Sequence, residues 1–144
     1  MIELSQLDVF VQDLATTALG FALNASDDQR IEDAAVTARL ELSGEWSGAL
    51  EIRCDSVMAA EVAAALFCAA VDELGESEIN DAVGELTNIL AGNIAPLLSN
   101  DCRLNLPVIL GDSVPSETVE VVMDSTYVSE KAALSVHLFT EATS

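Results

Sequence analysis

Glu85 and Asn88 are two polar residues, three positions apart, in a segment whose apolar residues recur every three or four positions. That spacing predicts an amphipathic helix, with a core stripe of Ile79, Ala82, Val83, Leu86, Leu90 and Leu97. Side chains three apart lie side by side on a helix. At about 100° per residue, Glu85 and Asn88 fall opposite the stripe. The helix therefore displays a carboxylate and a carboxamide together to solvent.

Asp81, Gly84 and Gly92 fall on the same side of this predicted helix as Asn88. A Gly inside a helix is about 1 kcal/mol less favourable than Ala, so the two glycines cost about 2 kcal/mol together. On an exposed face they fill no core space. We interpret them as lowering the surface around Asn88, and we predict that Asp81, Gly84 and Gly92 bind a partner macromolecule. The alternative is an ordinary solvated face, because Glu-x-x-Asn is common by chance.

The length and composition favour one folded domain spanning residues 1–144. The chain is 51% apolar, enough for a substantial core. The longest uncharged interval, Leu86–Asn100, is shorter than the roughly 18 residues of a membrane span. The segment Met1–Ser5 lacks the basic flank of a signal peptide. We therefore predict a cytoplasmic protein.

The formal net charge is −20, from 25 acidic residues and five basic ones. The basic residues are Arg30, Arg39, Arg53, Arg103 and Lys131. Nucleic acids and anionic membranes need Lys and Arg to replace counterions, so this balance argues against both partners. Any partner is expected to present at least one positive group at the contact.

The cysteines and the single histidine do not suggest a metal site. Cys54, Cys68 and Cys102 are widely separated, and their odd number argues against a disulfide scaffold. We interpret them as small buried hydrophobes. His137 stands in an alternating, strand-like run and is expected to point outward. Without a second His, a zinc site or a Ser-His triad is hard to build.

Three helices are predicted. The first spans residues 5–22, with Ser5 as its N-cap. The second begins at a cap on Asp55 or Ser56 and runs to about Ala70. The third follows Gly75 and carries Glu85 and Asn88. It is expected to bend or end near Pro96, because a proline ring removes one backbone hydrogen bond.

The strands are predicted in two groups, with a polar loop at residues 24–33 ahead of the first. Residues 36–43 and 46–54 alternate in polarity around Gly44-Glu45, which predicts a β-hairpin. Three further strands are predicted at residues 103–110, 118–123 and 133–139. This grouping indicates an α+β fold, with an antiparallel or mixed sheet and helices packed on one side.

The run from Asn80 to Asn93 resembles the signature helix of the CheX, CheC and FliY chemotaxis phosphatases. A second run, Leu104-Asn105-Leu106-Pro107-Val108-Ile109-Leu110-Gly111, resembles the strand and loop that follow that helix in CheX-like proteins. The leading helix, hairpin and closing strands also stand in the CheX order. CheC-type proteins usually present two Glu-x-x-Asn helices. Here Glu61 in the second helix has no Asn at the matching offset, so the resemblance favours CheX.

The resemblance implies a function and a partner. The substrate would be the phosphoaspartate of a response-regulator receiver domain such as phosphorylated CheY. Asn88 would orient the attacking water, and Glu85 would pair with the active-site lysine of the receiver. The Mg²⁺ would belong to the receiver, so this chain would bind no cofactor of its own. A cytoplasmic homodimer joined through the sheets is also implied.

Two alternatives stay open from the sequence. The first is a non-catalytic CheX-like module that binds a receiver domain or a flagellar switch component in two-component signalling. The second is a structural dimerisation domain in which the Glu-x-x-Asn face is plain solvated surface.

Overall fold

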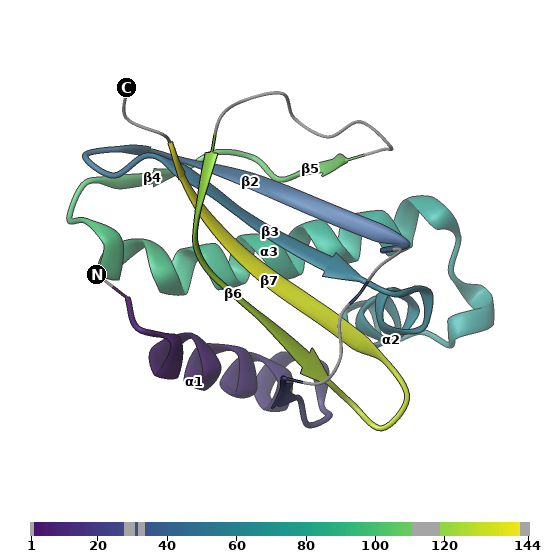
Figure 1. Cartoon of the computed structure of the whole chain (residues 1–144). Coiled ribbons are helices and arrows are strands. Elements are labelled where there is room, and N and C mark those ends of the chain that lie inside the picture. Colours follow the sequence, from purple (N-terminus) through teal and green to yellow (C-terminus); the bar gives the residue numbers. More distant parts are fainter. Residues whose placement is uncertain (1, 28–30, 32–33, 111–118, 142–144) are drawn as a thin grey trace.

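The computed structural model describes residues 2–27, 31, 34–110 and 119–141 (Figure 1). Gly111 of the second resembling run lies outside these residues. So do Thr118, where a strand was predicted to begin, and residues 28–30 and 32–33 of the loop predicted at residues 24–33.

Helices and strands alternate in groups along the described chain. The helical segments are α1 (Leu4–Leu14), the π-helical turn η1 (Ala15–Leu19), α2 (Ser56–Phe67), the 3₁₀ turn η2 (Val71–Glu73) and α3 (Glu76–Leu98). The strands are β1 (Asn24–Ser26), β2 (Val36–Gly44), β3 (Gly48–Cys54), β4 (Cys102–Leu104), β5 (Val108–Leu110), β6 (Val119–Val128) and β7 (Ala133–Glu141).

These strands form one antiparallel sheet in the order β1-β6-β7-β3-β2-β4. The strand β5 also pairs with β2, so β4 and β5 together form one edge. The helices lie on one side of this sheet, with α3 running behind β2 and β3 (Figure 1). The predicted α+β class with an antiparallel sheet is confirmed.

The core lies between the sheet and the helices. Successive residues of a strand face opposite sides, so every second residue of β2, β3 and β7 points toward the helices. These positions are buried and apolar: Val36, Ala38, Leu40, Leu42, Leu50, Ile52, Cys54, Leu134, Val136 and Leu138. The opposite, open face carries the polar partners Arg39, Glu51 and His137.

The predicted hairpin is confirmed at β2 and β3, which pair from Val36↔Cys54 to Leu42↔Gly48. Its turn requires a glycine at Gly44. There φ is +122°, a conformation that L side chains rarely adopt, and a Cβ would overlap the backbone carbonyl of Asp101.

The N-terminal segment departs from its prediction in three places. Glu3, not Ser5, is the N-cap, because the side chain of Gln6 accepts a hydrogen bond from the Glu3 N–H at 2.7 Å. The α-helix ends at Leu14, and η1 continues it to a left-handed Gly20 with φ of 77°. Residues 24–26, predicted as loop, form β1 because they pair with the distant β6.

Two later elements, α2 and the strand predicted at residues 103–110, also differ from their predicted bounds. Asp55 caps α2 as predicted, accepting from the Met58 N–H at 2.7 Å. The helix ends at Phe67 because Cys68 is left-handed, with φ of 53°. The strand predicted at residues 103–110 is two short strands, because Pro107 between them cannot donate to a ladder.

Of the three cysteines, Cys54 is buried, Cys102 is half-buried and Cys68 is exposed, and all three are free thiols. The interpretation as buried hydrophobes therefore holds for Cys54 only. Cys68 is exposed because it terminates α2 rather than lying on its packed face.

Candidate functional site

Helix α3 begins at a well-formed cap. The Gly75 N–H donates to Glu78 Oε1 at 3.2 Å, and the Ile79 N–H donates to the Gly75 carbonyl at 3.1 Å. Glu76 and Glu78 place negative charge in the first turn, which the helix dipole favours. The predicted start after Gly75 is confirmed.

The buried face of α3, which includes Ala82, Val83, Leu86, Leu90 and Ile94, packs between the helix α2 and the strands β2 and β3. Leu97 was predicted to belong to this face but is 36% exposed. Leu97 lies in the last turn of the helix, directly after Pro96 and beyond Ala95, the last buried residue of α3. Leu98 packs against the core instead. The helix ends two residues after Pro96, as predicted.

Glu85 is exposed and Asn88 is half-buried on the outer side of α3. Among the described residues, neither side chain has a hydrogen-bond or ion-pair partner. The described part of the chain also contains no buried side-chain nitrogen or oxygen without a partner. The Asn88 amide is therefore reached by solvent, and both groups are free to bond to another molecule.

The three residues predicted around this pair divide into two kinds. Asp81 and Gly92 are exposed, as expected for a contact surface. Gly84 is buried, which contradicts its predicted place on the open face. A Cβ built at Gly84 would lie 3.6 Å from Pro107 Cγ and 3.7 Å from its Cβ. The proline ring of the same chain covers this glycine, so Gly84 contacts its own fold rather than solvent.

The segment that covers Gly84 is residues 105–107, which we call the β4–β5 connector. Asn105 fixes its start, because its backbone N–H and its Nδ2 both donate to the Glu41 carbonyl, at 3.0 and 3.1 Å. Pro107 fixes its end against α3. Leu106 between them is 85% exposed. This run carries part of the resemblance to CheX-like proteins, but local sequence patterns predict no role for Leu106.

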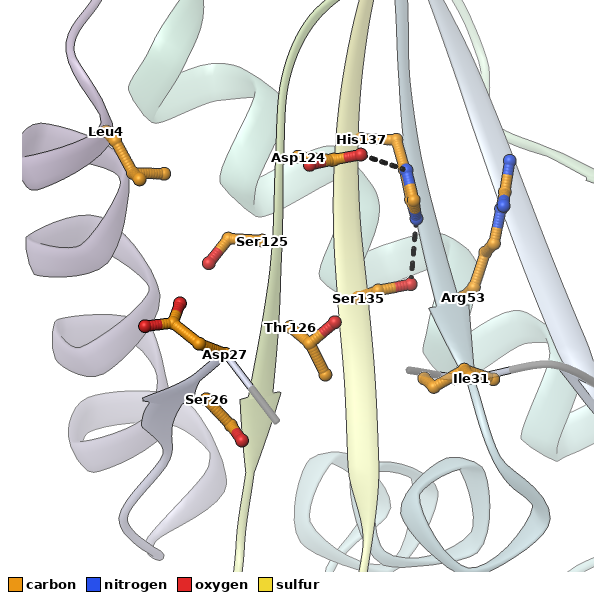
Figure 2. Close-up of a pocket in the computed structure, with 10 residues that line it drawn as sticks. All are labelled: Leu4, Ser26, Asp27, Ile31, Arg53, Asp124, Ser125, Thr126, Ser135 and His137. Carbon is orange, nitrogen blue, oxygen red and sulfur yellow. Dashed lines mark hydrogen bonds and ion pairs between the residues drawn. The ribbon is translucent and has the colours of Figure 1, made fainter. Parts of the chain in front are cut away.

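A second group of polar side chains lies on the open face of the sheet, around a cavity of about 310 Å³. Figure 2 shows a row of three polar side chains, with Asp124 of β6 at one ring nitrogen of His137 and Ser135, on β7 like the histidine, at the other. His137 Nε2 lies 2.9 Å from Ser135 Oγ, and its Nδ1 lies 4.0 Å from Asp124 Oδ2. His137 does face away from the core, but its side chain is only 16% exposed. Burial, together with the charge of Arg53, lowers its pKa.

This row brings together the residue types of a Ser-His-Asp triad, although a single histidine in the chain made such a triad unexpected. It lacks the His–Asp hydrogen bond, the accessible serine and the oxyanion site that a catalytic triad requires. The 4.0 Å separation of His137 and Asp124 is longer than a hydrogen bond. Ser135 is 4% exposed, and β7 is paired on both sides, with β3 and β6. Its backbone N–H groups are therefore engaged in ladders rather than available to an oxyanion.

Within the described residues, no group of three or more His, Cys, Asp or Glu side chains is placed to hold a metal ion. None of the described helices is long and apolar enough to cross a membrane.

Comparison with known families identifies the family of the chain. The model of the family described as chemotaxis phosphatase CheX matches residues 36–128, which include α3 and the β4–β5 connector. The chain belongs to the CheX family. The predicted resemblance to this family is thereby confirmed.

Solved structures agree on the fold. The CheX protein of Vibrio vulnificus is 18% identical, with a TM-score of 0.74 over 94% of this chain and 95% of that one. The CheX-CheY-BeF3-Mg+2 complex of Borrelia burgdorferi is 18% identical, with a TM-score of 0.68 over 94% and 95%. Thermotoga maritima FliY is 15% identical, with a TM-score of 0.58 over 99% and 93%. Among the curated proteins, none matches the sequence significantly.

Proposed function

We propose that this CheX-family chain dephosphorylates the phosphoaspartate of a CheY-like receiver domain. The observation that carries the proposal is the Asn88 amide, solvent-accessible and without a partner among the described residues, on a helix anchored in the core. Membership in a phosphatase family and the fold shared with a CheX bound to CheY support it.

Asn88 is suited to orient a water molecule. An acyl phosphate hydrolyses readily, so catalysis consists mainly of holding the water in line with the departing aspartate carboxylate. The amide oxygen accepts a hydrogen bond from that water, and the NH₂ group donates to a neighbouring acceptor. Because the amide is uncharged, it adds no repulsion beside the phosphoryl group.

Glu85 is suited to set the register of the complex. It is exposed one helical turn before Asn88, so it reaches the same partner surface. We propose that it pairs with the active-site lysine of the receiver. An exposed ion pair contributes about 0–1 kcal/mol, and more when the interface excludes water. The Mg²⁺ that neutralises the phosphoryl charge would be held by the receiver.

The chain is further proposed to act as a cytoplasmic homodimer in two-component signalling. The dimer and the pathway rest on the family, whereas the cytoplasmic location rests on the sequence pattern described above. Analytical ultracentrifugation of the purified chain tests the dimer directly.

The decisive experiment measures the decay of a phosphorylated receiver with the wild type, with Asn88→Ala, and with Asn93→Ala as a matched control. Asn93 is an exposed asparagine on the same helix, so its loss tests for nonspecific effects on α3. We expect Asn88→Ala to lose the acceleration, at a cost of about 10²–10³ in kcat, the loss found when one hydrogen-bonding side chain is removed from an oxyanion hole. The control should keep it. Equal decay rates for wild type and Asn88→Ala would remove Asn88 from the mechanism.

The same assay separates the alternative of a non-catalytic module. A wild-type chain that binds the receiver without shortening the lifetime of its phosphoaspartate would be such a module. Glu85→Ala should weaken binding more than turnover, which a change in KM with an unchanged kcat would reveal.

A further inference from the structure

The β4–β5 connector runs alongside the outer face of α3. A Cβ built at Gly92 would lie 4.0 Å from the side chain of Leu104, and one at Gly84 would lie 3.6 Å from Pro107. Asn88 is midway between the two glycines, about 6 Å along the helix from each. Leu106 likewise lies, in sequence, between Leu104 at the end of β4 and Pro107 at the end of the connector. The segment therefore places Leu106 beside the turn of α3 that carries Asn88.

Leu106 is exposed even though its neighbours are fixed. It is 85% exposed, the largest fraction among the exposed large apolar side chains of the described residues. Asn105 before it is held by two hydrogen bonds to the Glu41 carbonyl, and Pro107 after it packs on Gly84. Leu104, two residues earlier, is 39% exposed and adds apolar area. An apolar group on a fixed backbone loses little conformational entropy when a partner covers it.

We infer that Leu106 is the apolar anchor by which this chain docks onto the receiver domain, next to the phosphorylated pocket; the inference rests on the proposed function. Asp81 and Glu85 supply a negative rim for the cationic group of the receiver. Leu106 then inserts into an apolar hollow of the receiver beside that pocket. Protein interfaces commonly combine a buried apolar anchor with a polar rim in this way. Leu106 acts in binding, and Asn88 acts in catalysis.

The experiment compares wild type, Leu106→Ser, Leu106→Met and Val9→Ser. Val9 is a matched control because it is 61% exposed on α1, across the molecule from β4 and β5 in Figure 1. Binding is measured by calorimetry with a receiver loaded with BeF₃⁻ and Mg²⁺, and turnover by steady-state phosphate release. Burial of one leucine side chain predicts that Leu106→Ser raises Kd and KM roughly ten- to hundredfold. We expect an unchanged kcat, near-normal binding by Leu106→Met and no effect of Val9→Ser.

Three results would overturn the inference. Leu106→Ser and Val9→Ser could bind the receiver equally well, which leaves the proposed function standing. Leu106→Ser could break up a dimer while its Kd for the receiver stays normal, which would assign the leucine to a contact between copies of this chain. A wild type that neither binds nor dephosphorylates any receiver from the same cell would overturn the proposed function and this inference together.

Discussion

The two glycines inside α3, Gly84 and Gly92, allow the idea of a lowered contact surface to be tested. Replacing either with Ala adds one methyl group. At Gly84 it would meet Pro107 at 3.6 Å, and at Gly92 it would meet Leu104 at 4.0 Å. Both distances are ordinary van der Waals contacts, so neither substitution forces the chain to move. The environments differ in one respect: Gly84 is buried by its own chain, whereas Gly92 is exposed.

Each substitution is expected to stabilise the fold. Ala is favoured over Gly in a helix interior by about 1 kcal/mol, and for a chain of this size that gain raises Tm by about 3 °C. Only Gly92→Ala is expected to weaken binding to a receiver, because only its methyl group stands on the open surface. Gly84→Ala is the matched control for the change in helix propensity.

Urea unfolding measures the stability of both variants, and calorimetry with a receiver carrying BeF₃⁻ measures binding. Destabilisation by either variant would show that the packing around the glycine is tighter than these distances indicate. Equal receiver affinity of Gly92→Ala and Gly84→Ala, both unchanged from wild type, would refute the interpretation of Gly92 as a site of close approach.

Two further predictions follow from buried titratable groups. Burial lowers the pKa of His137 below its ordinary value of 6.5, so the unfolded chain binds this proton first as the pH falls. The wild type should therefore lose unfolding free energy relative to His137→Gln between pH 7.5 and 5; a constant difference across that range in urea titrations would contradict this. Burial raises the pKa of the Cys54 thiol, whereas Cys68 is exposed. A thiol reagent should modify Cys68 in the native protein and Cys54 only after unfolding, as peptide mapping by mass spectrometry would show.

The sequence alone was sufficient to predict helix α3 and its polar pair. Helical periodicity, the glycine at the cap and the proline near the end all act within a few residues, so they can be recognised without knowledge of the fold. The alternation in β2 and β3 predicted the hairpin for the same reason, because its turn joins adjacent segments. Glu85 and Asn88 were identified because their spacing is a property of the helix itself.

The surroundings of that pair were decided by the tertiary structure. Periodicity placed Gly84 on open surface, but Pro107, 23 positions later, covers it. Leu106 was not predicted as exposed, because its position depends on the contact between Asn105 and Glu41, 64 residues apart. The short strand β1 was likewise missed, since its pairing partners in β6 lie about a hundred residues away. Local patterns determine which face a helix presents, whereas contacts between distant segments determine which parts of that face remain open to a partner.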